Sequence, residues 1–353
     1  MKKYILILVS ILILSGCGGG GGGSSKLSDE LENLSTSVTI PIIPIGTAID
    51  HSDYAWNLNE TSQLNSALDS YNINSNAHIN ISDNTNSNKI KVAIIDQGFQ
   101  YNHPDIASKI IDVKYMNNTI LTDSFHGTAV AGVIASDSLG VAPDNVELIL
   151  INVDFDLLGE DQFIEAFQYA KDAGAQIINC SWGSSFSDLI YGFSSTYLSV
   201  LEDLKNNNIH VVFASGNDGF DLDDNWTTDG EIEFVLGVGA TSKDNTVTTY
   251  SNYGSNIDIY APGGTAELGV VTLDLTGTQG YNGFGTNYSY WTGTSFATPA
   301  ITGVIARLLS IDSTLTPDEV NTLLKNNSDI INSDLTADTY LKVNVQKAID
   351  NLP

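Results

Sequence analysis

The chain has 353 residues, and its 42% hydrophobic and 9% aromatic residues are enough for a sizeable core, which excludes disorder throughout. Its 14 basic and 42 acidic residues give a net charge of −28. So negative a chain repels phosphate backbones, so we do not expect nucleic acid as a partner. The charges are not in blocks, and we interpret the acidity as a soluble, non-sticky surface. Two cysteines exclude a disulfide framework.

The N-terminus has the features of an export signal. Lys2 and Lys3 precede an apolar run over residues 4–14, which is too short to span a bilayer and is typical of a secretory signal. The following Leu-Ser-Gly-Cys resembles the bacterial lipobox, in which the signal is cleaved before the cysteine and the thiol is acylated. We therefore predict a lipoprotein signal peptide over residues 1–16 and lipidation of Cys17, in preference to an ordinary signal peptide that happens to contain a cysteine.

A flexible tether follows the predicted lipidation site. Residues 18–25 are six glycines and two serines, and we assign residues 17–50 to the acylated cysteine and a Gly/Ser-rich tether or linker. Several acyl chains on Cys17 would anchor the protein stably to a membrane. The glycine directly after Cys17 resembles the outer-membrane sorting class. We therefore expect an exported bacterial lipoprotein, on the outer membrane or the cell surface.

A short helix is expected around residues 66–71, and from residue 90 onward short apolar runs alternate with helical patterns. The runs predict buried strands, and the strands and helices together predict a parallel sheet with helices on both faces. The predicted strands cover 91–95, 147–153, 176–180, 210–214 and 234–240, and the predicted helices cover 128–136, 162–173 and part of 188–206. Cys180 lies in one of these strands and is interpreted as a small core residue. Near the C-terminus, a capping box at residues 316–319 predicts a helix through Leu324.

Two polar residues stand at the predicted strand and helix ends in the first half of the chain. Asp96 ends the first strand, and Gly98 permits a tight exit from it. Functional groups collect at the carboxyl ends of parallel strands, although an aspartate there is also a common turn residue. His126 begins a helix with unusually small residues, which would let that helix approach the sheet closely. The alternative for His126 is a core or surface histidine.

Two further polar residues follow in the second half. Asn217 comes after the strand at 210–214 and is either part of a Gly-Asn turn or an amide donor aimed at an oxyanion. Ser295 lies at the start of a buried helix, where backbone N–H groups are unpaired and the helix dipole favours an anion. Thr294 or Ser295 could instead be a helix N-cap. Pro299 places the helix start near Thr294, because proline belongs in about the first turn.

The order Asp, His, Asn, Ser resembles that of the subtilisin-like serine proteases, or subtilases, over residues from about 90 to 326. The matching strings all occur in the same order. They are Ile-Ile-Asp-Gln-Gly (94–98), His-Pro-Asp-Ile (103–106), His-Gly-Thr-Ala-Val-Ala-Gly (126–132), Gly-Val-Ala-Pro (140–143), Ser-Gly-Asn (215–217), Ser-Asn-Tyr-Gly (251–254), Ala-Pro-Gly (261–263) and Gly-Thr-Ser-Phe-Ala-Thr-Pro (293–299). The resemblance implies an α/β fold, a subtilisin-like three-layer α/β/α arrangement with a mainly parallel central sheet.

The same resemblance implies a secreted, membrane-anchored serine endopeptidase that forms an acyl-enzyme. Ser295 would be the nucleophile, His126 the general base and then acid, and Asp96 the residue that orients His126. Asn217 and the backbone N–H of Ser295 would form the oxyanion hole.

The resemblance also implies where a peptide substrate binds. Ser181, Trp182 and Gly183 resemble the edge strand that pairs with an extended peptide, and residues 156–159 are a weaker match to the opposing edge. Residues 51–353 would be the peptidase domain with its N-terminal segment, and no separate pro-domain is expected. The partners implied are protein or peptide substrates and, through Cys17, a membrane. The oligomeric state and the preferred substrate side chain are left open.

The sequence departs from the family pattern at several positions. Gln97 replaces a small hydroxyl residue, and Trp182 is bulkier than the usual leucine, so it would narrow a substrate pocket or supply an aromatic wall. Asp105 matches a calcium ligand of some relatives, but residues 136–140 are too short to supply its partners. We therefore predict no metal site; no cofactor is required, and calcium is possible but not located.

The subtilase fold offers two alternatives to a serine endopeptidase. One is a subtilase-fold surface protein that binds peptides without cleaving them, and Gln97 and the altered loops keep this alternative open. The other is a sedolisin-type acid peptidase, which uses a Glu–Asp pair in place of the histidine. The intact His-Gly-Thr at His126 argues against that alternative.

Overall fold

The computed structural model describes residues 89–116, 125–137, 139–155, 159–183, 192–224, 228–277, 280, 287–333, 336 and 338–353. The predicted signal peptide, Cys17, the tether and the helix predicted at 66–71 lie outside the described residues. So do residues 156–158 of the weaker substrate edge.

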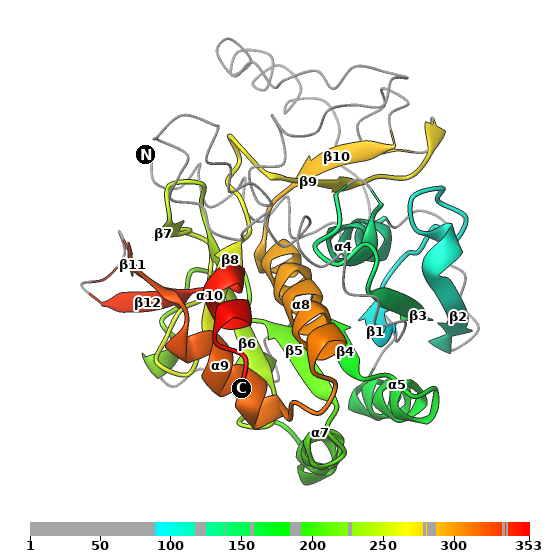
Figure 1. Cartoon of the computed structure of the whole chain (residues 1–353), viewed down its shortest axis with the longest axis horizontal. Helices are drawn as coiled ribbons and strands as arrows, with labels where there is room; N and C mark the ends of the chain where they lie inside the picture. Colours follow the sequence, from blue (N-terminus) through cyan, green and yellow to red (C-terminus); the bar gives the residue numbers. More distant parts are fainter. Residues whose placement is uncertain are drawn as a thin grey trace, which may run out of the picture.

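A ten-stranded, mainly parallel sheet forms the middle of the molecule (Figure 1), with the strand order β2-β3-β1-β4-β5-β6-β7-β11-β12-β8. Every neighbouring pair from β2 to β6 is parallel, whereas β6–β7 and β11–β12 are antiparallel. The strands are β1 (Ile90–Asp96), β2 (Ile110–Tyr115), β3 (Val146–Asn152), β4 (Ile177–Cys180), β5 (His210–Ala214), β6 (Leu236–Thr241), β7 (Thr246–Val247), β8 (Ile259–Pro262), β11 (Asp329–Ser333) and β12 (Thr339–Lys342).

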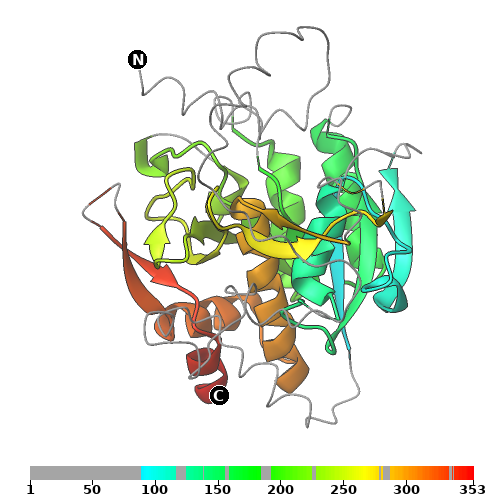
Figure 2. The same cartoon turned by 90° about the horizontal axis from the view of Figure 1, so that it is seen from above.

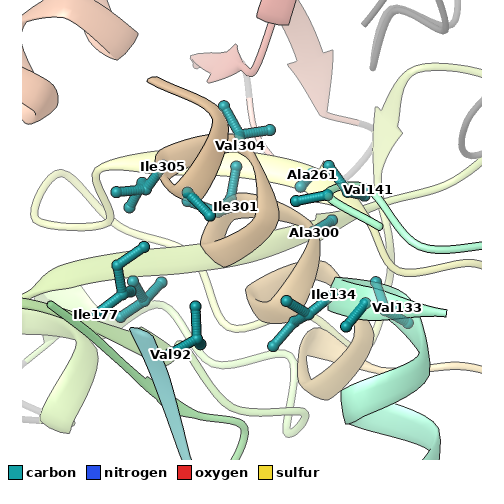
Figure 3. Packing of buried hydrophobic residues seen from close by; sticks show 14 of the residues in the cluster. Val92, Val133, Ile134, Val141, Ile177, Ala261, Ala300, Ile301, Val304 and Ile305 are labelled. Carbon is teal, nitrogen blue, oxygen red and sulfur yellow. The ribbon is translucent and has the colours of Figure 1, made fainter. Parts of the chain in front are cut away.

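Helices cover both faces of the sheet, which confirms the predicted three-layer fold. Side chains alternate along a strand, so Val92 and Ile94 of β1 pack with one pair of helices, and Ala93 and Ile95 pack with the other. The first pair is α4 (His126–Ala135) and α8 (Thr294–Ile311), and the second is α5 (Glu160–Asp172) and α7 (Ser195–Asn206). Figure 3 shows the packing of α8 against α4 and the strands.

Helix α8 is the central helix of the core. It is long and apolar enough to cross a membrane, but 89% of its apolar window is buried inside the protein, as expected for a core helix. Pro299, expected in about the first turn, is the sixth residue of α8 and lies in its second turn. The predicted helix start near Thr294 is confirmed.

The C-terminal part of the chain returns to the same sheet. Helix α9 (Pro317–Asn326) starts with the predicted capping box, in which Thr316 Oγ1 accepts the N–H of Glu319, and Glu319 Oε2 accepts the N–H of Thr316 at 2.9 Å. Strands β11 and β12 and helix α10 (Val345–Asp350) follow. The 3₁₀ helices are η3 (Ala107–Lys109), η5 (Leu222–Asp224) and η6 (Asp229–Glu231).

A small antiparallel sheet of β9 (Val270–Leu273) and β10 (Tyr288–Trp291) was not predicted from the sequence. Figure 1 and Figure 2 both show it crossing over α4 and the start of α8. Gly132 of α4 allows this close approach, because a Cβ atom there would lie 2.4 Å from Thr272 Oγ1. Thr272 Oγ1 also donates a hydrogen bond to the carbonyl of Ala129 at 2.7 Å.

The far end of α4 is held by hydrogen bonds and an ion pair between side chains. Lys109 is buried, donates to the carbonyl of Ala135 at 2.6 Å and pairs with Asp137. Asp105 accepts hydrogen bonds from the hydroxyl groups of Ser136 and Tyr288. Among the residues that the structure describes, no group of three or more His, Cys, Asp and Glu side chains could hold a metal ion.

Candidate active site

The candidate site lies where the strand order reverses around β1. Strand β1 pairs with β3 on one side and with β4 on the other, so Asp96 at its carboxyl end faces the crevice in which α/β proteins bind ligands. Ser181–Gly183 follow β4, and Asn217 follows β5, so parallel neighbours deliver these residues to the same edge of the sheet.

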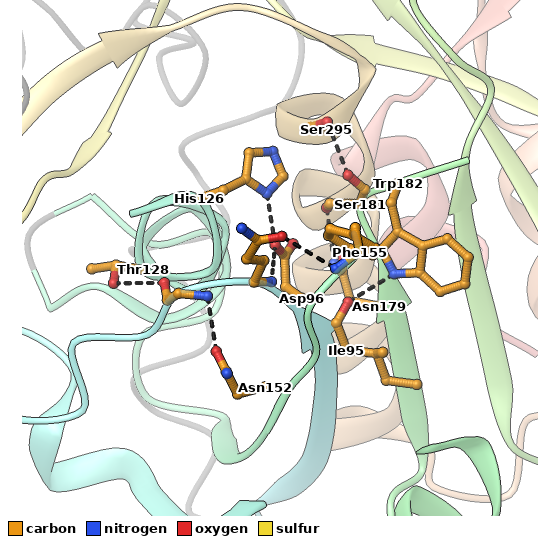
Figure 4. Close-up of polar contacts among 12 residues, drawn as sticks. Ile95, Asp96, His126, Thr128, Asn152, Phe155, Asn179, Ser181, Trp182 and Ser295 are labelled. Atoms are coloured by element: carbon orange, nitrogen blue, oxygen red, sulfur yellow. Dashed lines mark hydrogen bonds and ion pairs between the residues drawn. The ribbon is translucent and has the colours of Figure 1, made fainter. Parts of the chain in front are cut away.

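Asp96 and His126 form a hydrogen-bonded pair. Asp96 is fully buried, and its Oδ1 accepts hydrogen bonds from His126 Nδ1 at 2.7 Å and from the N–H of Gln97 at 2.6 Å. Its Oδ2 is buried and has no hydrogen-bond partner. Because the proton of His126 lies on Nδ1, the other ring nitrogen of the neutral imidazole carries a lone pair. Figure 4 shows His126 beside Asp96, with Ser295 at the start of α8 on the other side of the ring.

The pKa of His126 is raised above its ordinary value of 6.5. Burial by itself lowers this pKa, because it disfavours the charged imidazolium. The negative charge of Asp96 and the hydrogen bond to it together outweigh burial. The pair therefore stabilises the protonated form that a histidine base reaches after it takes a proton.

The first turn of α4 is fixed to the end of β1 by backbone hydrogen bonds. The N–H of Gly127 donates to the carbonyl of Gln97 at 2.8 Å, and the N–H of Thr128 donates to that of Gly98 at 3.1 Å. Gly127 has no room for a side chain, since a Cβ atom would lie 2.6 Å from the ring of Phe99. These contacts place His126, the first residue of α4, next to Asp96.

Ser295 is the second residue of α8, and its hydroxyl group donates to the carbonyl of Ser181 at 2.9 Å. Within the described part of the chain, His126 and Ser295 form no hydrogen bond with one another. Hydrogen bonds between catalytic groups often tighten only when substrate binds. A rotation about the Cα–Cβ bond of Ser295 would redirect its hydroxyl group from Ser181.

The proposed N-cap roles of Thr294 and Ser295 are not what the structure shows. The N-cap of α8 is Gly293, whose φ of 142° favours glycine. Thr294 instead donates its N–H, at 2.8 Å, and its hydroxyl, at 3.0 Å, to Oδ1 of Asn217. With its oxygen held in this way, Asn217 keeps its NH₂ group for another acceptor. That group lies at the start of α8, because a Cβ atom built on Gly293 would lie 3.6 Å from Asn217 Nδ2 and 3.7 Å from the backbone nitrogen of Ser295.

The substrate edge predicted at Ser181–Gly183 runs directly from β4 to the candidate nucleophile. Trp182 lies in a cluster of aromatic rings: its Nε1 donates to the carbonyl of Ile95 at 2.8 Å, and its ring stacks on Phe163 with centroids 4.3 Å apart. Phe155 lies 5.9 Å from the Trp182 ring, and its N–H donates to Oε1 of Gln97. Phe155 thus contacts both residues that depart from the family pattern, Gln97 and Trp182. Cys180, just before, is buried and free.

The sequence is recognised by two family models. Residues 87–349 match the model described as "Subtilase family", and residues 1–17 match a prokaryotic membrane lipoprotein lipid attachment site. The chain belongs to the subtilase family. Its first residues carry the attachment-site signature of exported, membrane-anchored lipoproteins, as the lipobox at Cys17 predicted.

Individual subtilases show the same relationship. This subtilase is 29% identical to halolysin of Haloferax mediterranei over 282 residues, which cover 76% of this chain and 50% of the relative. It is 30% identical to the subtilisin of Bacillus pumilus over 277 residues, covering 75% of this chain and 92% of the relative. A thermophilic serine proteinase of Bacillus sp. is 31% identical over 62% of this chain and 52% of its own length. The matching part thus spans about half the length of two of these relatives.

Solved structures share the fold of this subtilase. The nisin leader peptidase NisP from Lactococcus lactis superposes with a TM-score of 0.66 at 23% identity, over 85% of this chain and 94% of that one. A cold-adapted subtilisin-like serine proteinase superposes with a TM-score of 0.64 at 24% identity, over 82% and 98% of the two chains. At these identities the likeness establishes the subtilisin-like fold.

Three features of the site were not predicted from the sequence. They are the bonds from Thr294 to Asn217, the bond from Ser295 to Ser181, and a row of stacked aromatic rings beside His126. Only the aromatic residues left a sequence signal, since phenylalanine directly precedes the histidine and directly follows the serine.

Proposed function

We propose that this subtilase is a serine endopeptidase that hydrolyses peptide bonds through an acyl-enzyme. Asp96, His126 and Ser295 are the catalytic residues, and Asn217 with the backbone N–H of Ser295 forms the oxyanion hole. The observation that carries the proposal is the Asp96–His126 hydrogen bond of 2.7 Å, which leaves the lone pair of the imidazole for a proton from Ser295. The matching family motif and the position of Ser295 at a helix N-terminus support it.

The reaction proceeds in two halves. The hydroxyl of Ser295 turns from Ser181 to His126, its oxygen forms a bond to the peptide carbonyl carbon, and its proton passes to the imidazole. Asn217 and the Ser295 N–H stabilise the oxyanion, and His126 gives its proton to the leaving amine as the C–N bond breaks. Water, deprotonated by His126, then hydrolyses the acyl-enzyme by the same steps and frees Ser295.

The substrate is an extended stretch of a protein or peptide. It pairs with the backbone of Ser181–Gly183 as an added strand. The same carbonyl of Ser181 that holds the Ser295 hydroxyl lies on this edge, so the nucleophile and the substrate backbone meet there. A surface protein that binds peptides without cleaving them is the alternative function.

The proposal also assigns a role to each part of the chain. Residues 1–16 are the signal peptide, residues 17–50 carry the acylated Cys17 and the tether, and residues 51–353 are the peptidase domain. The anchored enzyme acts at the outer membrane or the cell surface, and its chemistry requires no cofactor.

The proposal is tested with a fluorophosphonate serine probe on the full-length chain, purified in detergent. The Ser295 oxygen is expected to bond to phosphorus as fluoride leaves, and the adduct is located by peptide mass spectrometry. Labelling confined to the peptide with Ser295 would support the endopeptidase. A folded chain that stays unlabelled, yet binds peptides, would favour the alternative.

The activity should depend on pH through His126. The general base must be neutral, and the charge of Asp96 raises the pKa of His126, so kcat/KM should fall as the pH drops through a value above 6.5. The measurement is a pH profile of kcat/KM on a peptide substrate. Activity retained near pH 4 would contradict a histidine base and point to a carboxyl mechanism.

Removing the side-chain oxyanion donor should lower kcat far more than it changes KM. For Asn217→Leu we expect a loss of roughly 10²–10³ in kcat, the effect of one such donor. Thr294→Val removes only the hydroxyl that holds Oδ1 of Asn217 and leaves the Thr294 N–H, so its loss should be smaller. Steady-state kinetics measure both. Equal kcat in Asn217→Leu and the parent would exclude Asn217 from the oxyanion hole.

A further inference from the structure

Three aromatic side chains form a row beside the candidate triad, and we call Phe125, Trp291 and Phe296 the aromatic row. The rings of Phe125 and Trp291 are stacked with centroids 4.3 Å apart and planes at 17°. Trp291 and Phe296 are nearly parallel, at 16°, with centroids 6.4 Å apart. Phe296 in turn lies 5.7 Å from the imidazole of His126. One end of the aromatic row therefore lies next to His126, the proposed base.

Each member of the row is adjacent to a different part of the site. Phe125 is the N-cap of α4 and directly precedes His126. Phe296 is buried and directly follows Ser295 in α8. Trp291 ends β10, the strand that leads into α8. Trp291 thus contacts the neighbours of both proposed catalytic residues, which are carried by two separate helices.

The contacts between β9 and α4 lie farther along the helix than the aromatic row. Thr272 bonds to Ala129, and Gly132 packs against Thr272 and Leu273, about one turn or more beyond His126. They hold the body of α4 in the core. The aromatic row is the contact at the exposed end of α4, where Phe125 and His126 are only partly buried.

We propose that Trp291 is a positioning residue that sets the separation of His126 and Ser295. This inference rests on the proposed function. No hydrogen bond joins these two residues in the described part of the chain, so the packing of their helices sets the distance between base and nucleophile. A misplacement of about 1 Å can lower a reaction rate by about 10²-fold. Stacking of Trp291 between Phe125 and Phe296 limits that displacement.

The test compares Trp291→Ala and Trp291→Phe with the parent in the full-length chain. We expect Trp291→Ala to slow fluorophosphonate labelling of Ser295 by about tenfold or more, and Trp291→Phe, which keeps a stacking ring, to restore most of the rate. In peptide hydrolysis the loss should appear in kcat rather than KM. In the pH profile of kcat/KM, the pKa of the acid limb should stay near that of the parent, because the substitution leaves the Asp96–His126 hydrogen bond in place.

The labelling rate separates positioning from a contact with substrate. The probe has only fluoride as its leaving group, so if Trp291 merely touched the departing half of a peptide, Trp291→Ala would raise KM and leave the labelling rate unchanged. That result, or equal labelling of Trp291→Ala and the parent, would overturn the inference. So would a loss in Trp291→Phe as large as in Trp291→Ala. A parent that does not label at all contradicts the proposed function instead, and the inference falls with it.

Discussion

Ser295→Ala is expected to lower kcat for peptide hydrolysis by about 10⁶-fold, the size of the loss when the nucleophile of a subtilisin is removed. Alanine has no oxygen to form the acyl-enzyme, so only binding and the oxyanion donors would remain to accelerate attack by water. Labelling by the fluorophosphonate should disappear completely. The measurement is single-turnover and steady-state hydrolysis of the same peptide by both proteins.

The same change should leave the fold nearly intact. It removes one hydrogen bond, from Ser295 to the carbonyl of Ser181 at 2.9 Å, which is worth about 1 kcal/mol of unfolding free energy. Ser310→Ala is the matched control, because Ser310 lies on the same helix and donates to the carbonyl of Arg307. It should label and hydrolyse like the parent. If Ser295→Ala kept activity at the level of Ser310→Ala, Ser295 would not be the nucleophile.

The central sheet and the Asp96–His126 pair were predictable because local patterns determine them. Continuous apolar runs such as 92–95 are expected to form buried strands or core helices, and parallel strands bring their carboxyl ends to one edge of the sheet. Asp96 at such an end and His126 at the start of a helix of small residues meet through this topology, and the structure places them in hydrogen-bond contact.

The remaining strands have weaker local signals. Strand β2 lies at an edge of the sheet and mixes Asp112 and Lys114 with apolar residues. The β9–β10 pair is short, and it is stabilised by packing over α4. This packing involves Gly132 and Thr272, which come from distant parts of the chain. A local stretch of sequence cannot predict a contact between residues so far apart in the chain.

The resting position of Ser295 is another result of tertiary structure. Sequence places a serine at a helix start, but its hydroxyl bonds to the carbonyl of Ser181, which another strand delivers. The same holds for the aromatic row, whose members Phe125 and Trp291 lie far apart in the chain and stack in space. Motifs therefore indicated the residues of the candidate site, whereas the contacts that these residues make required the structure.

Asp96→Asn is expected to lower kcat for peptide hydrolysis by about 10⁴-fold. Both hydrogen bonds to the carboxylate, from His126 and Gln97, end on Oδ1. An asparagine can therefore keep its oxygen in that position and hold the imidazole in the same tautomer, with its NH₂ group at the buried site of Oδ2. What it loses is the negative charge that stabilises the imidazolium during proton transfer.

The pH profile of this variant identifies the cause of its lower rate. Without the charge of Asp96, burial is left to lower the pKa of His126, so the residual activity should persist to lower pH than that of the parent. Asp105→Asn is the matched control, since Asp105 is another carboxylate that accepts hydrogen bonds, in its case from the hydroxyl groups of Ser136 and Tyr288, but it lies outside the triad. Its rate and acid limb should stay close to the parent values. An acid limb of Asp96→Asn at or above that of the parent would show that Asp96 acts on His126 through geometry rather than through charge.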